Sequence, residues 1–123
     1  MLNSYYHIAE RAKAHLSDFK TVSNTVPYEE KGVLYSEILF MLAYLNWSIP
    51  RRILESGRAR GQSTLLLARA LPNTEILSIE FHKDSPDVPV AAQRLREYKN
   101  VQLLFGDARV MMPRLVQDGD VVI

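Results

Sequence analysis

Three acidic residues stand where apolar stretches of the sequence end. Glu55 and Glu80 each close such a stretch, and Asp107 follows a third one two residues after Phe105. If these stretches are parallel strands, the three carboxylates lie at one edge of a sheet, in the crevice where open α/β sheets bind ligands. Carboxylates gathered there can accept hydrogen bonds and attract a positively charged group.

The segment after the first stretch combines a turn with the start of a helix. It reads ESGRARGQST from Glu55 to Thr64, and its small residues are Gly57, Ala59 and Gly61. Glycine adopts positive φ easily and lets the backbone come close to a ligand. The first amides of the helix that follows would point into the crevice.

Three ligand-binding patterns can be compared with this turn. The dinucleotide fingerprint G-x-G-x-x-G, aligned on Gly57, requires glycine where the chain has Ala59 and Gln62. A Walker A loop requires four residues between its glycines and then lysine, whereas Gly57 and Gly61 are closer and Gln62 replaces the lysine. The pattern acidic-x-G-x-G-x-G fits better, since only Ala59 departs from it, by one methyl group.

On these residues, the sequence from about 51 to 123 resembles the class I S-adenosylmethionine-dependent methyltransferases, in particular their small-molecule O-methyltransferase branch. The resemblance implies S-adenosyl-L-methionine as the cofactor and methyl transfer to a hydroxyl of a small molecule. It places Glu55 near the methionine end, Glu80 on the ribose hydroxyls and Asp107 by the adenine amino group. The cofactor-binding residues that it implies are Glu55, Ser56, Gly57, Ala59, Gly61, Ser63, Glu80, Phe81, Asp107 and Ala108.

Structural interpretations of the same residues remain open. Asp107, in Gly-Asp-Ala, could cap the helix that follows, and Glu80 could be a solvated strand end. Arg58 and Arg60 are expected to be solvated, although pairing with Glu55 or with a substrate carboxylate is an alternative. A second function is open too: a non-catalytic nucleoside-cofactor-binding or interaction domain with a methyltransferase-like fold.

The hydrophobic periodicity predicts an α/β chain. Helices are expected at 3–20, 34–47, 62–71, 88–98 and 108–116, a loop at 21–31, and strands at 53–55, 75–80, 101–105 and 120–123. Strands separated by helices predict a Rossmann-like parallel sheet with right-handed crossover helices, preceded by two N-terminal helices. The second helix is apolar on nearly every side, so we expect it to be buried, with Tyr44 and Trp47 in the core.

The expected organisation is an N-terminal helical segment, residues 1–50, and an incomplete S-adenosylmethionine-binding domain, residues 51–123. The resembling enzymes have seven strands and commonly place a base or metal-binding acid just after the fourth, so no catalytic residue is assigned. We therefore expect a chain truncated after its fourth strand, or one completed by a partner chain, and inactive alone. Its exposed sheet edge would allow a homo-oligomer.

Composition limits the other possibilities. The chain has 123 residues, 47% of them hydrophobic, and a formal net charge of +1, which suits one domain and gives no basic excess for nucleic acid or a membrane surface. It has no cysteine, which excludes disulfides, thiolate ligands and a cysteine nucleophile. No signal peptide and no metal-ligand spacing are recognisable, so we expect a cytoplasmic protein without a metal.

Overall fold

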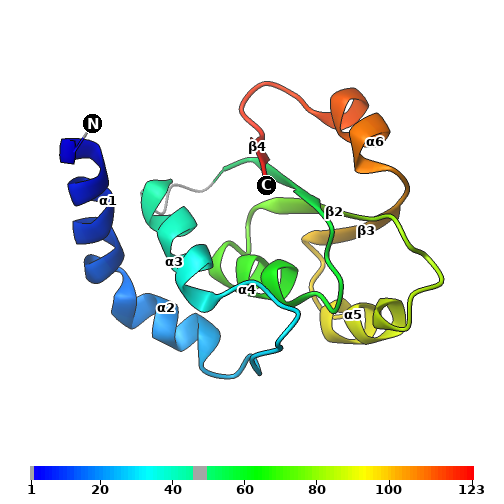
Figure 1. Cartoon of the computed structure of the whole chain (residues 1–123), viewed down its shortest axis with the longest axis horizontal. Helices are drawn as coiled ribbons and strands as arrows, with labels where there is room; N and C mark the ends of the chain where they lie inside the picture. Colours follow the sequence, from blue (N-terminus) through cyan, green and yellow to red (C-terminus); the bar gives the residue numbers. More distant parts are fainter. Residues whose placement is uncertain (1, 46–49) are drawn as a thin grey trace.

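A four-stranded parallel sheet organises the chain, whose computed structural model describes residues 2–45 and 50–123 (Figure 1). The strands are β1 (Arg52–Ser56), β2 (Glu75–Glu80), β3 (Val101–Phe105) and β4 (Val121–Val122). Their order is β3-β2-β1-β4, and every neighbouring pair is parallel. The predicted α/β, Rossmann-like sheet is therefore confirmed. No helix in the described ranges has the length and apolar character needed to cross a membrane.

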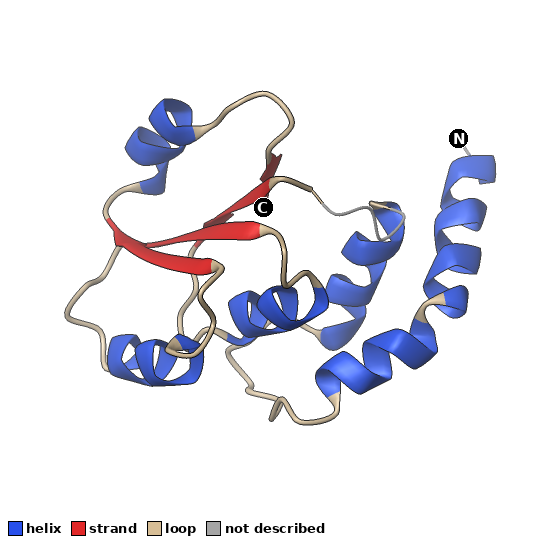
Figure 2. Ribbon diagram, turned by 180° about the vertical axis from the view of Figure 1, so that it is seen from behind, coloured by secondary structure: helices blue, strands red, loops and turns tan. Residues whose placement is uncertain are grey.

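Three crossover helices connect the strands: α4 (Gln62–Ala70), α5 (Asp87–Leu95) and α6 (Ala108–Leu115). Figures 1 and 2 show α4 and α5 on one face of the sheet and α6 on the other. This follows from the strand order, because right-handed crossovers from β1 to β2 to β3 run in one direction and the return to β4 runs in the other. The strand order reverses between β1 and β4, which makes that position the expected ligand crevice.

The core lies around the two central strands. Ile53 and Leu54 of β1 and Ile76 of β2 are fully buried, and they belong with Leu66 and Leu67 of α4 among the most deeply buried side chains. Such continuous apolar strands are typical of a parallel sheet whose central part is covered on both faces.

An ion pair fixes β4 beside β1. Arg52 Nη2 lies 2.5 Å from Asp120 Oδ2, and the same guanidinium donates to the Leu115 carbonyl at 2.6 Å. The amide of Ser56, at the end of β1, donates to the Ile123 carbonyl at 2.9 Å. The approach to β4 is thus tied to the strand that leads into the turn.

The N-terminal segment contains three helices rather than the predicted two: α1 (Leu2–Ala14), α2 (Leu16–Ser23) and α3 (Tyr35–Tyr44). The expected single helix at 3–20 breaks at His15, with φ −93° and ψ 2°. The break lets α1 pack against α3 while α2 packs against α4. Because α2 continues to Ser23, the predicted loop at 21–31 begins later, at Asn24.

The expectation that the second helix, α3, is buried holds for one face only. Ile38, Leu42 and Ala43 form its buried face, but Phe40 is 44% and Tyr44 66% exposed. The helix packs on one side only, so apolar composition overstated its burial. Tyr44 is therefore not a core residue, and Trp47 lies outside the described residues.

Candidate functional site

The turn between β1 and α4 has an unusual backbone. Gly57, Ala59 and Gly61 all have positive φ, at 78°, 44° and 80°. Glycine tolerates this left-handed region, while a residue with a side chain is strained there. The small residues in the sequence thus correspond to three left-handed positions, which alternate with Arg58 and Arg60.

The two glycines of the turn have different surroundings. A Cβ placed on Gly57 would meet no atom within 4 Å, whereas one on Gly61 would lie 3.1 Å from Leu95 Cδ1 and 3.3 Å from Ala91 Cβ. Gly57 also lines a cavity of about 340 Å³ with Glu55 and other residues of α3, β1 and α4. Gly57 therefore borders open space, and Gly61 lets α5 pack against the start of α4.

Ala59 should be improved by glycine. A left-handed backbone costs a non-glycine residue roughly 1–2 kcal/mol, of which roughly 0.4–1 kcal/mol is lost again through the greater freedom of glycine in the unfolded chain. We expect Ala59→Gly to raise the free energy of unfolding by about 0.5–1 kcal/mol, measured by denaturant titration. Ala68→Gly, inside α4, is the control and should be destabilising; equal destabilisation by both substitutions would contradict the prediction.

Glu55 is buried and held by hydroxyl groups. Its side chain accepts hydrogen bonds from Ser63 and Thr64 in the first turn of α4, and from Ser78 Oγ of β2 at 2.6 Å. Only 3% of the residue is exposed. These hydroxyls, and not the arginines of the turn, are its hydrogen-bond partners, and they fix the carboxylate at the wall of the cavity.

Glu80 joins the turn to the loop after β2. Its Oε2 accepts from the amides of Ala59, at 3.1 Å, and Arg58, at 3.4 Å, while its Oε1 accepts from the His82 amide at 3.1 Å. Partial burial raises the pKa of Glu80, but the amide hydrogen bonds outweigh it and hold the pKa below the ordinary value of 4.5. The side chain is therefore an ionised carboxylate at neutral pH.

Arg58 is buried, so the expectation that it is solvated is wrong. The residue is 3% exposed, and its Nη1 donates to the carbonyls of Ser78, at 2.5 Å, and Leu104, at 3.0 Å. Its guanidinium carbon lies 4.7 Å from the ring centroid of Phe105, a cation–π distance. Burial lowers the pKa of Arg58. The side chain connects the turn to β2 and β3. The sequence did not reveal this role, because Ser78 and Leu104 are 20 and 46 residues away from Arg58.

Arg60 is paired rather than solvated, and its partner is not Glu55. It forms ion pairs with Glu29 and, at 3.4 Å, with Asp87 Oδ1, and Arg94 Nη1 lies 3.4 Å from Glu29 Oε1. We call these four residues, Glu29, Arg60, Asp87 and Arg94, the Glu29 cluster. It connects the N-terminal segment, the turn and α5.

Gln62 has a role that the sequence did not reveal. It is 2% exposed; its Nε2 donates to the Val33 carbonyl at 2.6 Å, and its Oε1 accepts from the Glu29 amide at 2.6 Å. The residue that argues against a Walker A loop is thus a buried link to the N-terminal segment. The sequence carries no signal for this link, because the partners of Gln62 are 33 and 29 residues away along the chain.

Asp107 caps α6, as one interpretation of the sequence predicted. Its Oδ1 accepts from the Arg109 amide at 2.9 Å, and its Oδ2 lies 2.7 Å from Arg109 Nη2. The hydrogen bond from the Arg109 side chain lowers the pKa of Asp107. Ala108, the other predicted site residue here, is the first residue of the helix.

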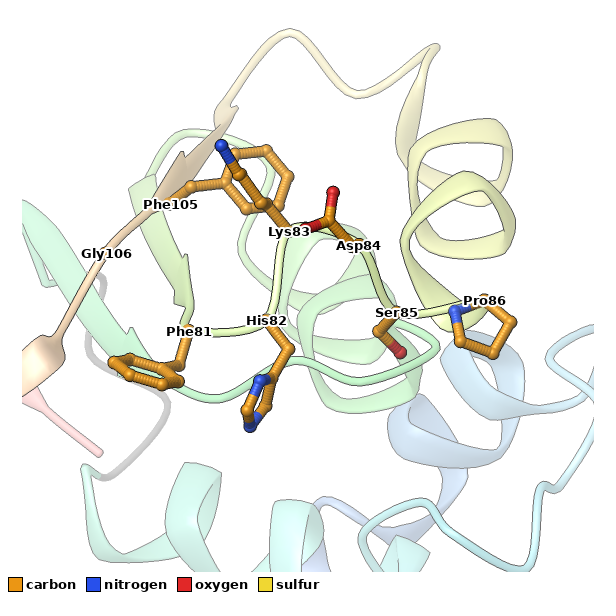
Figure 3. Close-up of a pocket in the computed structure, with 8 residues that line it drawn as sticks. All are labelled: Phe81, His82, Lys83, Asp84, Ser85, Pro86, Phe105 and Gly106. Atoms are coloured by element: carbon orange, nitrogen blue, oxygen red, sulfur yellow. The ribbon is translucent and has the colours of Figure 1, made fainter.

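A second cavity, of about 670 Å³, lies beside the ends of β2 and β3. The loop 81–86 lines it together with Phe105 and Gly106, and Figure 3 shows Phe81 and His82 projecting from this loop. The Gly106 amide donates to the Glu80 carbonyl at 3.0 Å. The structure therefore brings Glu80 and the residues around Asp107 to adjacent strand ends, as predicted. Among the described residues, no group of three or more histidines and acids could hold a metal ion.

The strand order, the turn and the acidic strand ends together define the class I S-adenosylmethionine-dependent methyltransferase fold of the O-methyltransferase type. The O-methyltransferase TomG from Streptomyces achromogenes, solved in complex with SAM, superposes with a TM-score of 0.60 at 26% identity, over 87% of this chain and 52% of TomG. SAH-bound PaMTH1 from Podospora anserina shares the fold with a TM-score of 0.62 at 20% identity, over 89% of this chain and 48% of its own.

The chain belongs to a methyltransferase family. The family described as "Putative methyltransferase" matches residues 51–122, more than half of the sequence. Among curated proteins, malonyl-acyl-carrier protein O-methyltransferase from Xylella fastidiosa (strain M23) is 27% identical over 88 residues, which cover 68% of this chain and 29% of the relative. The chain therefore spans about half the length of the solved structures and less than a third of this relative.

Proposed function

We propose that the chain binds S-adenosyl-L-methionine across the carboxyl ends of β1, β2 and β3, and serves methyl transfer to a hydroxyl of a small molecule. The observation that carries the proposal is the surroundings of Gly57, which faces open space beside the carboxylates of Glu55 and Glu80. A ligand can approach the backbone there without meeting a side chain. The similarity to TomG, solved with SAM, supports the same cofactor.

The residues present suit the three parts of this cofactor. The methionine end would lie along Gly57, where Glu55 and Ser63 line the same cavity and a carboxylate suits an ammonium group. The ribose hydroxyls would donate to the ionised carboxylate of Glu80. The adenine would lie near Phe81, which is 60% exposed beside the second cavity, and near Asp107.

The bound cofactor supplies an activated methyl group on a sulfonium. This chain's own residues supply position and charge: the turn holds the cleft open at Gly57, and the carboxylate of Glu55 is oriented by three hydroxyls. Such preorganised positioning and electrostatics can provide much of the acceleration of a displacement reaction. The acceptor would enter over Ile38 and Met41 of α3, which line the smaller cavity with Glu55.

Calorimetric titration tests the proposed cofactor. We expect the chain to bind S-adenosylmethionine and S-adenosylhomocysteine, and to bind NAD at least tenfold more weakly, about 1.4 kcal/mol. Equal or tighter binding of NAD would contradict the proposal. Methyl transfer is then measured with radiolabelled cofactor and small hydroxyl-bearing acceptors. Turnover would identify an enzyme, whereas binding without turnover would agree with the expectation that this chain is inactive alone.

A further inference from the structure

A short segment of the N-terminal half runs against the turn. We call residues 29–33 the strap; it precedes α3 and begins with Glu29. The neighbours of Glu29 face outward, since Tyr28 is 54% exposed and Glu30 is exposed as well, whereas the Glu29 side chain is only 23% exposed. Glu29 is therefore the acid of this stretch that is directed into the protein.

Both the side chain and the backbone of the strap bind the turn and the helix after it. The carboxylate of Glu29 pairs with Arg60 of the turn. The Glu29 amide donates to Oε1 of Gln62, and the Val33 carbonyl accepts from Nε2 of the same side-chain amide, each at 2.6 Å. One residue of the turn and the first residue of α4 are thus held by the two ends of the strap.

The Glu29 cluster supports the turn from the side of α5 as well. Arg94 Nη1 donates to the Arg60 carbonyl at 3.1 Å and also reaches Glu29, while Arg60 Nη1 reaches Asp87. All four side chains are at most 35% exposed. Two guanidinium groups therefore meet two carboxylates around the backbone of residue 60, where water screens them less than at an open surface.

The strap is packed closely as well as bonded. A Cβ on Gly32 would lie 2.5 Å from both Cδ and Nε2 of Gln62. Only a residue without a side chain allows the strap to approach the Gln62 amide in this way. The contact between strap and turn therefore rests on shape as well as charge.

We infer that the strap holds the turn in its ligand-binding conformation, with Glu29 as a positioning residue for the cofactor. The turn needs such support, because Ala59 is strained at φ 44° and Gly57 and Gly61 have more backbone freedom than other residues. The inference rests on the proposed function for the identity of the ligand. It adds that residues outside the family match, which begins at residue 51, set cofactor affinity.

The experiment compares Glu29→Gln with Glu30→Gln, an isosteric substitution at the exposed neighbour. We expect Glu29→Gln to weaken the binding of S-adenosylhomocysteine about fivefold at low salt, because it removes the partly exposed ion pairs with Arg60 and Arg94, and Glu30→Gln to leave it unchanged. Raising the salt concentration should weaken binding by the wild-type protein toward that of Glu29→Gln, while the variant changes little. Arg60→Gln, which also removes the ion pair with Asp87, should weaken binding at least as much as Glu29→Gln, and the double variant should lose less than the sum of the two single losses.

Hydrogen exchange gives a readout that does not depend on the cofactor. Glu29→Gln should speed the exchange of amides 57–61 in the free protein, and Glu30→Gln should not. Unchanged binding and unchanged exchange in Glu29→Gln would overturn the inference while the proposed function stands. If the wild-type protein binds no S-adenosylhomocysteine, the proposed function fails, and exchange at 57–61 alone decides whether the strap holds the turn.

Discussion

Replacing Glu80 with glutamine is expected to weaken the binding of S-adenosylhomocysteine by about 10- to 100-fold, because hydrogen bonds to a charged group contribute about 1.5–3 kcal/mol. The carboxylate stands at the end of β2 and is ionised, and the ribose hydroxyls would donate to it beside the amides of Arg58, Ala59 and His82. Glutamine keeps the shape but replaces one acceptor oxygen with a donor. Calorimetry on the wild-type and variant proteins measures the difference.

Glu75→Gln is the matched control for this prediction. Glu75 begins the same strand at its opposite end, where it accepts a hydrogen bond from Gln102 at 2.7 Å. Binding should not change in this variant. An unchanged affinity in Glu80→Gln would show that Glu80 only holds the turn and does not contact the ligand.

Glu80→Gln should also change how the stability of the fold depends on pH. The pKa of Glu80 in the folded chain lies below 4.5, so its ionisation stabilises the fold above that pH, and the contribution is lost as pH falls through the lower, folded-state pKa. Glutamine does not titrate. The wild-type protein should therefore lose stability relative to Glu80→Gln on acidification below 4.5, as thermal unfolding at several pH values would show.

Gly57→Ala is expected to reduce cofactor affinity about 10- to 100-fold, because an extra methyl group in a close contact costs about 1–3 kcal/mol. In the free protein the new Cβ has open space around it, so the loss of stability should be about 1 kcal/mol, from the left-handed backbone alone. Calorimetry and denaturant unfolding measure the two effects separately.

Gly61→Ala provides the opposite case. Its Cβ would press against Leu95 and Ala91 of α5, so we expect a loss of stability of about 2–4 kcal/mol from backbone strain together with overpacking. The comparison therefore distinguishes a glycine needed by the ligand from one needed by the packing. If Gly57→Ala lost stability as Gly61→Ala does and kept its affinity, the cleft would lie elsewhere.

The second half of the fold could be predicted closely from the sequence. The strands at 75–80 and 101–105 have the predicted bounds, and the helices between the strands differ by a few residues at their ends. Here each apolar stretch is short, bounded by turn residues and buried by its neighbours in sequence, so local pattern and tertiary structure agree.

The partners of long polar side chains could not be predicted. Arg58 and Arg60 were expected in solvent, yet one is bound by backbone carbonyls of two other strands and the other by Glu29. No pattern in a sequence records which distant carbonyl or carboxylate will face a guanidinium. The break at His15 and the exposed Tyr44 have a similar cause, since both depend on how helices pack.

The contacts of Arg58 also bear on protein design. The turn from Glu55 to Thr64 is continuous in sequence and could be transferred to another protein as one segment. The guanidinium of Arg58, however, is bound by the carbonyls of Ser78 and Leu104 and the ring of Phe105, which lie outside the segment. Grafted into another sheet without equivalents of these groups, the segment would carry an unpaired charge into the interior. A transplanted turn would need Phe105 and both strand ends from this protein, or an apolar residue at position 58.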